Sequence, residues 1–379
     1  MNYIANVTPL EQLLAQQRPG FSLDQPFYVN DEIYQLDLTR VLAKQWLYLD
    51  HVSNIVNPGD YLCYEFGDES IIVVRNKEAE LHAHHNVCRH RGSKLCLQEQ
   101  GHTKRLDCPY QAWTYNLDGD LLVAKQMNNG FGKRDYSLKP CRVEELEGLI
   151  FINIDPDDAP DFKEFRDNLT SFIKPHGIPD AKIVHTHNYA VEANWKLVVE
   201  NFRECYHCSP SHPEYSSVNA YVKAGDQKLG SYFPEVEKWI SEHSNSPFEK
   251  GFKNFPNHLQ PHHAWRMPIN HGFKTATQDG QSAGPLMGEF ADYGYDMAET
   301  GLFFGPLSYF YFNNDHAVAF RVTPRGTQQT DVLVNWLVHK EAQENLDYTI
   351  DHLSWLWNIT TIQDGEITEN NQLGVNSNH

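Results

Sequence analysis

The sequence predicts an α+β fold with a small antiparallel β domain at about residues 45–158 and a larger domain at 159–379. Three observations lead to this prediction. Between about 47 and 156, short apolar or alternating segments are separated by Gly, Asn and Asp, which is typical of antiparallel strands. The segment 160–183 is charged and contains prolines, so it marks a domain boundary. Apolar residues recur at helical spacing before and after the β-rich region.

Composition limits the class of protein. The chain has 379 residues, 40% of them hydrophobic, which is enough for two packed domains. Its formal net charge of −19 and its lack of a basic run argue against a nucleic-acid partner. No apolar run reaches membrane-spanning length, and the first 20 residues lack the apolar core of a signal peptide. The seven cysteines, an odd number, predict no disulfide framework. We therefore expect a soluble cytoplasmic protein without membrane contact.

The elements of the first half follow from pattern and punctuation. Residues 1–44 are expected to form a helical segment that packs on the larger domain, with a helix at about 31–45. The segments 52–66 and 69–87 predict short antiparallel strands. The segment VEELEGLIFINIDPD predicts one more strand, which closes the small domain.

Two loops interrupt these strands with residues that bind metals. Cys88 and His90 lie in NVCRHRG, and Cys108 opens the second loop, CPYQ, which ends at Gln111. In a Rieske centre two thiolates hold one iron of a [2Fe–2S] cluster and two imidazoles hold the other, in the pattern Cys-x-His and Cys-x-x-His. Three of the four positions match. A zinc loop, or a turn with a buried cysteine, is the alternative.

The fourth position departs from this pattern, because Gln111 stands where a histidine is expected. A carboxamide is a neutral, hard oxygen donor and replaces an imidazole poorly on iron. His102, in the spacer, is a candidate substitute ligand. The nearby trio His82, His84 and His85 cannot converge on one ion, because successive residues of a strand face opposite ways.

A second constellation lies in the larger domain. The segment NWKLVVENFRECYHC predicts a helix at about 193–208, which places Glu200, Glu204 and His207 on one face. Pro210 ends this helix, and the following loop brings His212 back toward His207. Two histidines and a carboxylate are the ligands of non-haem Fe(II) sites. Alternatively, these are two surface histidines that flank a turn.

The carboxylate of such a site has a candidate far downstream. A long helical pattern that includes Leu346, Ile350, Leu353 and Trp357 places Asp364 near its end.

Taken together, the chain resembles the α subunits of Rieske non-haem iron oxygenases, and most of all those of the glycine betaine monooxygenase type. The resemblance is carried by NVCRHRG, CPYQAWTYNLDG, NWKLVVENFRECYHCSPSHPE, WLVHKEA, DYTIDHLSWLWN and QDGEITENNQLGVNS. It covers essentially the whole chain, although the chain ends at His379, where relatives continue.

The resemblance implies a Rieske domain at 45–158 and, at 159–379, a catalytic domain with an antiparallel sheet covered by helices. It implies His207, His212 and Asp364 as ligands of mononuclear Fe(II), and Glu204 as the acid that links this iron to the cluster of a neighbouring subunit. A homotrimer follows, because such an acid has a role only in a closed ring. Electrons would come from NAD(P)H through a separate ferredoxin or flavin reductase.

The expected function is the hydroxylation by O2 of an N-methyl group on a quaternary ammonium compound, followed by demethylation. Such a substrate requires an aromatic cage, for which 301–312 and Trp265 are candidates, although each of these residues is also typical of a core. Two alternatives remain open. The chain hydroxylates aromatic rings, or Gln111 leaves it inactive in electron transfer.

Overall fold

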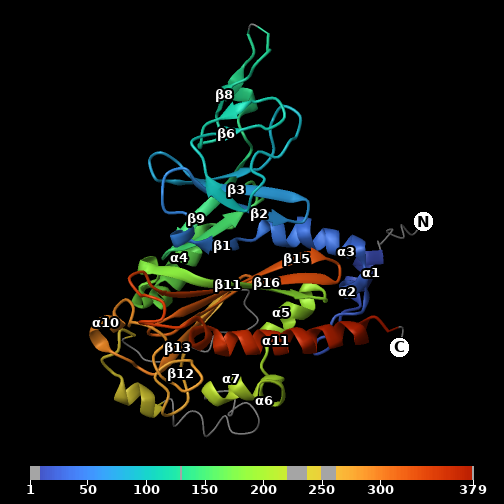
Figure 1. Cartoon of the computed structure of the whole chain (residues 1–379). Coiled ribbons are helices and arrows are strands. Elements are labelled where there is room, and N and C mark those ends of the chain that lie inside the picture. The colour runs from blue at the N-terminus through green and yellow to red at the C-terminus, as the bar shows by residue number, and fades with distance from the viewer. Residues whose placement is uncertain (1–8, 129, 220–236, 249–261, 378–379) are drawn as a thin grey trace, which may run out of the picture.

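The computed structural model describes residues 9–128, 130–219, 237–248 and 262–377. The small domain stands above a larger domain in Figure 1. The small domain contains a seven-stranded sheet in the order β1-β10-β9-β4-β3-β2-β5 and a three-stranded sheet in the order β6-β7-β8. The strands are β1 (Leu47–His51), β2 (Asp60–Phe66), β3 (Glu69–Arg75), β4 (Leu81–His85), β5 (Gln100–His102), β6 (Leu106–Asp107), β7 (Thr114–Tyr115), β8 (Leu121–Val123), β9 (Pro140–Leu146) and β10 (Leu149–Asn153).

The larger domain is built on a six-stranded antiparallel sheet in the order β11-β16-β15-β14-β13-β12. The predicted α+β fold class, with two antiparallel sheets and helices, is therefore confirmed. The strands are β11 (Ala181–Val191), β12 (His263–Pro268), β13 (Ala298–Phe304), β14 (Ser308–Phe312), β15 (Ala317–Gly326) and β16 (Gln329–His339). The helices are α4 (Phe162–Ile173), α5 (Trp195–Arg203), α6 (Cys208–Ser211), α7 (Pro213–Val218), α10 (Phe290–Tyr293) and α11 (Ile350–Val375).

The segment at 140–153 is a hairpin and not the single strand that the sequence predicted. β9 and β10 pair antiparallel, with Leu146 opposite Leu149. Glu147 and Gly148 form the two-residue turn, with φ of 49° and 83°. Two successive positive φ values give the turn type whose twist matches that of paired strands. The prediction failed because only Glu147 and Gly148 separate the two strands, and this pair is not the Asn-Gly or Asp-Gly sequence that marks such turns.

The large sheet is covered on both faces. One face packs against α5 and α11, and its core includes Trp195, Val198, Phe320 and Trp357. The other face packs against α4 and against β1 and β10 of the small domain. Figure 1 shows the same order, with α11 below the sheet and the small domain above it. The two domains thus share a core, and α11 is held along the face opposite the small domain.

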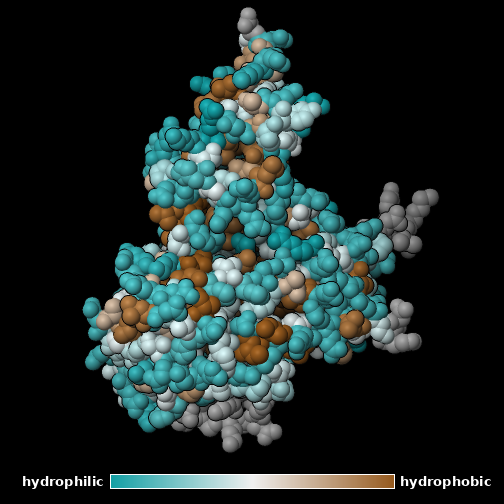
Figure 2. Space-filling view, in the orientation of Figure 1, coloured by the Kyte–Doolittle hydropathy of each residue, from teal (hydrophilic) through white to brown (hydrophobic). Residues whose placement is uncertain are grey.

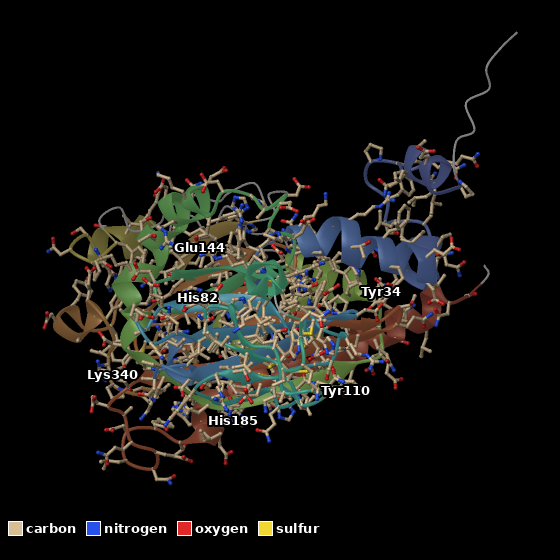
Figure 3. All side chains as sticks on the ribbon, turned by 90° about the horizontal axis from the view of Figure 1, so that it is seen from above. Tyr34, His82, Tyr110, Glu144, His185 and Lys340 are labelled. Atoms are coloured by element: carbon tan, nitrogen blue, oxygen red, sulfur yellow. A yellow bond between two sulfur atoms is a disulfide. The ribbon has the colours of Figure 1, made fainter. Side chains whose placement is uncertain are left out.

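The N-terminal segment packs on the larger domain. It contains α1 (Pro9–Ala15), α2 (Pro26–Val29) and α3 (Asp31–Leu36), followed by a π-helical turn to Val41 and a 3₁₀ turn to Lys44. The helix predicted at 31–45 is thus present as three consecutive pieces. The Tyr28 hydroxyl donates to Glu200 Oε1 at 2.9 Å, and Lys196 pairs with Asp37. Seen from above in Figure 3, Tyr34 of this segment and Lys340 lie on opposite sides of the molecule.

The helix predicted at 193–208 is wrong at its end. α5 stops at Arg203, and Glu204 has an extended backbone with φ −132° and ψ 159°. The helical pattern in the long downstream segment is present, but α11 begins at Ile350 after the N-cap Thr349 and continues to Val375. Asp364 therefore lies in the middle of α11 and not near its end.

The surface shown in Figure 2 is mostly hydrophilic, and hydrophobic residues appear there in small groups. Among the described residues, no helix has both the length and the apolar composition needed to span a bilayer.

His51 gives the fold a dependence on pH. Its ring is fully buried at the junction of the domains, where Nε2 lies 2.9 Å from the Ile178 carbonyl and Nδ1 2.9 Å from Ser53 Oγ. Burial lowers the pKa of His51 to about 4, although the Ile178 carbonyl opposes this shift. Protonation of the unfolded chain, near pH 6.5, therefore precedes protonation of the folded chain.

We predict that this histidine destabilises the fold as the pH falls from 7 to 5, and that the stability is retained above the unfolded pKa. Protonation of His51 should lower the free energy of unfolding by about 2 kcal/mol over this interval. The variant His51→Gln should lose correspondingly less stability over this interval in urea titrations at both pH values. His271→Gln, at an exposed position, serves as the control and should follow the wild type. An equal loss in His51→Gln and wild type would contradict the prediction.

Candidate metal centre

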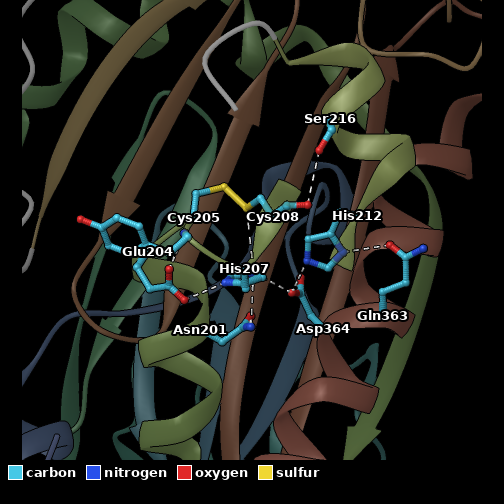
Figure 4. Close-up of a disulfide and its surroundings, with 10 residues drawn as sticks. Asn201, Glu204, Cys205, His207, Cys208, His212, Ser216, Gln363 and Asp364 are labelled. Carbon is cyan, nitrogen blue, oxygen red and sulfur yellow. Dashed lines mark hydrogen bonds and ion pairs between the residues drawn. A yellow bond between two sulfur atoms is a disulfide. The ribbon is translucent and has the colours of Figure 1, made fainter. Parts of the chain in front are cut away.

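Three side chains from separate parts of the larger domain meet below the sheet. His207 lies in the turn between α5 and α6, His212 between α6 and α7, and Asp364 on α11. One possible ligand atom of each lies within 4.8 Å of those of the other two. Figure 4 shows this arrangement. The structure thus brings together the three residues that the sequence suggested as metal ligands.

The donor atoms at this point fit a metal ion. Asp364 Oδ1 lies 2.9 Å from His212 Nε2 and 3.4 Å from His207 Nε2. Both Asp364 Oδ1 and His212 Nε2 are buried and lack a well-oriented hydrogen-bond partner. Buried polar atoms are rarely left in this state unless a ligand, ion or water completes them. Two imidazole nitrogens and one carboxylate oxygen are the donor set of non-haem Fe(II) sites.

The far side of each imidazole is held by a polar side chain. His207 Nδ1 lies 2.7 Å from Glu204 Oε1, and His212 Nδ1 lies 2.9 Å from Gln363 Oε1. The carboxamide of Gln363 in turn donates to Glu214 Oε2 at 2.9 Å. Because Nδ1 of each ring faces an acceptor, it carries the proton and leaves the Nε2 lone pair for a metal.

Without a metal, the three groups titrate as a coupled set. Burial opposes protonation of His207, but the carboxylates of Asp364 and Glu204 outweigh burial and raise its pKa. Asp364 likewise raises the pKa of His212 against the effect of burial. For Asp364, burial favours the neutral acid, and the two imidazoles beside it outweigh this effect, so its pKa is lowered. The site therefore holds an ionised carboxylate that requires positive charge beside it.

Glu204 and Glu200 have different surroundings from those predicted. The sequence placed both on one helical face with His207, but α5 ends before Glu204. Glu200 accepts a hydrogen bond from Tyr28 of the N-terminal segment and does not belong to the group of ligand atoms formed by His207, His212 and Asp364. Glu204 contacts His207, while its side chain remains 41% exposed. Glu204 thus connects the buried site with the surface.

A disulfide beside His207 was missed by the sequence reasoning. Cys205 and Cys208 are bonded, with their Cα atoms 4.9 Å apart. The expectation of no disulfide framework rested on the odd cysteine count, which says nothing about a local Cys-x-x-Cys turn. The only signal was this short spacing just after the helix. Figure 4 shows the bridge next to His207.

In the small domain the two loops bring their cysteines together. Cys88 and Cys108 are both buried in the same core cluster, and Cys88 Sγ lies 3.3 Å from the Tyr115 hydroxyl. Burial raises the pKa of Cys88, with a smaller contribution from Cys108 and an opposing one from Tyr115. The loops also meet at the surface, where Arg91 Nη1 donates to the Tyr110 hydroxyl at 3.3 Å. This half of the site fits the thiolate-bound iron of a cluster.

The residues that would bind the second iron of the cluster fit a Rieske centre less well. The His90 ring stacks on Trp113, with 4.7 Å between ring centroids. Gln111, which stands in the place of the second histidine, is exposed. His102 does not fill this place, because its Nδ1 bonds Asp60 Oδ1 at 2.9 Å on the neighbouring strand β2. The described residues therefore offer two thiols and one imidazole for a [2Fe–2S] cluster, and not the two imidazoles of a Rieske centre.

The other histidines of β4 form separate contacts. His82 lies near Asp118 and Glu80, and His85 Nδ1 bonds Glu69 Oε2 at 2.9 Å. His84 is buried and bonds the Leu117 carbonyl. Each thus has its own partners.

The aromatic segment at 301–312 divides between the two faces of the sheet, as alternation along strands requires. Phe303, Tyr309 and Tyr311 face the side of α5 and α11, together with the partly buried Trp265. Trp265 lies across Gly301, since a Cβ there would be 2.2 Å from its ring. Four other residues of this segment face the opposite side of the sheet, so they cannot belong to an aromatic cage beside the metal site: Leu302, Phe304, Phe310 and Phe312.

Two family models match the chain. The model described as ring hydroxylating alpha subunit (catalytic domain) matches residues 178–379, and the model of the Rieske [2Fe-2S] domain matches residues 45–143. These domains imply a [2Fe–2S] cluster and a mononuclear iron.

Individual proteins agree with this assignment. The oxygenase subunit of glycine betaine monooxygenase from Chromohalobacter salexigens is 37% identical over 369 residues, which cover 96% of this chain and 82% of that protein. The structure of the quaternary ammonium Rieske monooxygenase CntA with an inhibitor has a TM-score of 0.71 at 24% identity and covers 94% of this chain and 85% of that one. Naphthalene 1,2-dioxygenase from Rhodococcus sp. has a TM-score of 0.72 at 19% identity, with 97% and 86% covered, and thus shares the fold.

We predict that His207→Ala removes one bound divalent ion per chain while the fold is retained. Loss of one of three protein ligands should weaken binding by more than a hundredfold, measured by anaerobic Co²⁺ titration of the metal-free protein. His271→Ala, which removes an exposed histidine, is the matched control and should bind like the wild type. Wild-type affinity and stoichiometry in His207→Ala would exclude His207 as a ligand.

Proposed function

The chain belongs to the alpha subunits of Rieske ring-hydroxylating oxygenases, which are oxidoreductases, and we propose that it hydroxylates an N-methyl group of a quaternary ammonium compound similar to glycine betaine. The observation that carries the proposal is the convergence of His207, His212 and Asp364, where two buried ligand atoms lack a well-oriented hydrogen bond. The relationship to glycine betaine monooxygenase supports the substrate class.

In this proposal, His207, His212 and Asp364 hold a mononuclear Fe(II), and the iron supplies the activation of O2. Three protein ligands leave coordination positions for oxygen and substrate. Glu204 and Gln363 keep the two imidazoles turned with Nε2 toward the metal. The buried carboxylate of Asp364 balances part of the charge of the ion.

The aromatic side chains on the same side of the sheet would receive the cationic end of the substrate. A quaternary nitrogen has no hydrogen to donate, so it is recognised by ring faces. Phe303 and Trp265 lie with ring centroids 4.8 Å apart at 89°, and Tyr311 and Trp357 lie 4.2 Å apart. Hydroxylation inserts one atom of O2 into a methyl C–H bond, and two electrons and two protons reduce the other atom to water. The carbinol then loses formaldehyde and a proton to give the tertiary amine.

Two electrons per turnover must come from outside the chain. We propose a separate ferredoxin or flavin reductase that draws them from NAD(P)H, in a homotrimer where Glu204 faces a neighbouring subunit. The partial exposure of Glu204 supports this arrangement, because the same carboxylate contacts His207 in the metal site.

A second candidate is an oxygenase that is inactive in electron transfer. It is favoured by the exposed carboxamide of Gln111 where a Rieske centre needs an imidazole. Ring hydroxylation of an aromatic compound is the third candidate, supported by the fold shared with naphthalene dioxygenase.

We predict that iron-loaded protein, supplied with electrons by dithionite and a mediator and then with O2, releases formaldehyde from glycine betaine. His207→Ala should release none, which controls for chemical oxidation. Naphthalene is assayed in parallel for a hydroxylated product. Formation of that product without formaldehyde would replace the proposed substrate class with aromatic rings.

We predict that Gln111→His increases turnover with a reductase and produces a Rieske electron-paramagnetic signal that the native sequence lacks or shows weakly. The added imidazole would complete the second iron's ligand pair. Sedimentation velocity should give a trimer for both forms, because the exposed side chain at position 111 does not support the fold. A normal Rieske signal and full turnover with Gln111 would rule out the inactive candidate, and a monomer would rule out the trimer.

A further inference from the structure

One face of α11 carries an unusual set of buried polar atoms without partners. Trp357 Nε1, Thr360 Oγ1 and Asp364 Oδ1 are all buried and have no well-oriented hydrogen-bond partner in the part of the chain that the structure describes. The three residues are spaced by three and four positions, so they lie on one face of the helix. His212 Nε2, the fourth atom of this kind, faces Asp364. The proposed metal ion would complete the Asp364 and His212 atoms, but not those of Trp357 and Thr360.

The hydroxyl of Thr360 differs from those of three other helical threonines. The hydroxyls of Thr39, Thr170 and Thr361 each donate to the carbonyl four residues earlier, at 2.8, 2.6 and 2.5 Å. Thr360 is only 3% exposed and makes no such bond. Its hydroxyl is therefore available to a group outside the helix, because a buried hydroxyl is rarely left without a partner.

The indole of Trp357 is unpaired in the same way. The indole nitrogens of Trp46, Trp195 and Trp239 donate to Pro160 O, Asp37 and Asp296 O. Trp357 is 4% exposed, and its Nε1–H has no acceptor among the described residues. A buried indole N–H usually finds a partner.

We infer that the Trp357 indole N–H and the Thr360 hydroxyl bind the carboxylate end of the quaternary ammonium substrate. This inference rests on the proposed function, since it assigns the second end of that substrate. Both groups donate, and a carboxylate accepts two hydrogen bonds. The site is thus complementary to an anionic oxygen pair.

The spacing along α11 suits a small zwitterion. At a rise of about 1.5 Å per residue, Thr360 lies about 6 Å and Trp357 about 10 Å along the axis from Asp364. In glycine betaine a single methylene separates the quaternary nitrogen from the carboxylate. A methyl group near the metal therefore places the carboxylate toward Thr360, and the long indole side chain of Trp357 reaches the same region from the next turn.

Aromatic rings connect this region with the metal site. The Trp357 ring has its centroid 5.3 Å from Tyr215 and 5.1 Å from Phe320. Tyr215 lies 6.5 Å from His212. The cationic nitrogen can therefore contact rings between the metal and the two donors.

Charge also favours a zwitterion over a simple anion. α11 contains no Lys or Arg anywhere in its sequence. A carboxylate buried against neutral donors needs a positive charge nearby, and in a betaine the substrate's own ammonium supplies it. Choline, which ends in a hydroxyl, would lack the anionic acceptor and gain less from the two donors.

The test measures ligand binding to the anaerobic, Fe(II)-loaded protein by calorimetry. The probes are glycine betaine, choline and tetramethylammonium, which has no oxygen end. Trp357→Phe and Thr360→Val remove the donors with little change of shape. Each should weaken glycine betaine binding about tenfold to a hundredfold. Thr360→Val should leave tetramethylammonium binding unchanged, whereas Trp357→Phe, which keeps a ring face for the cation, should weaken it much less than it weakens glycine betaine binding. Iron content, measured in parallel, should equal that of the wild type.

The matched control is Trp336→Phe, because Trp336 Nε1 is also buried and unpaired but its ring contacts His185 of β11. It should bind all three probes like the wild type. Unchanged glycine betaine binding in Trp357→Phe and Thr360→Val would overturn the inference while leaving the proposed function intact. If Thr360→Val weakened tetramethylammonium binding as much as glycine betaine binding, the inference would also be overturned. A variant that lost affinity for choline alone would overturn it too. If the wild type binds none of the probes, the proposed function fails and the inference fails with it.

Discussion

The larger domain depends on one buried carboxylate. Asp364 is 8% exposed and lies between two imidazoles on a helix that is packed along the sheet. An ionised carboxylate in such a place costs several kcal/mol unless positive charge is close to it. Protonated histidines can supply this charge in the metal-free protein, and a divalent ion supplies it better. The position of α11 therefore fixes where a metal can bind, and the packing of α11 fixes the metal-site geometry.

The sequence predicted the residues of this site but not their local structure. His207 and His212 are five residues apart, so a turn alone brings them together, and short spacing is visible in a sequence. The end of α5 was not visible, because its apolar spacing continues past Arg203, although the backbone at Glu204 is extended. Asp364 was placed near a helix end because the following residues include Gly365 and several Asn and Thr, which are weak helix formers. Tertiary bonds hold that part of α11, where Gln372 and Glu369 accept from the backbone of Asn194 and Glu192.

The small domain shows why Gln111 does not prevent the fold. The first loop is fixed by backbone bonds from Cys88 to Ser93 and from Gly92 to Cys88, and the second by a bond from Cys108 to Trp113. None of these bonds uses the side chain at position 111, which is exposed. The backbone thus forms the loops whether the residue is Gln or His. The small domain can therefore have the family's fold with either residue at position 111. Its ability to bind a [2Fe–2S] cluster, in contrast, depends on that residue.

The two histidines of the metal site differ in what holds them. Glu204 is a partly exposed carboxylate, so its contact with His207 makes that imidazole a stronger donor to a metal. Gln363 is a neutral carboxamide, and its contact with His212 fixes the ring with less effect on its basicity. The connection to the surface therefore runs through His207, while His212 and Asp364 are held from α11, by Gln363 and by the helix itself. Since Trp357 and Thr360 lie on that same helix, any shift of α11 would move the carboxylate ligand and the two unpaired donors together. One helix thus carries both the carboxylate proposed as a metal ligand and the two donors proposed to bind the substrate.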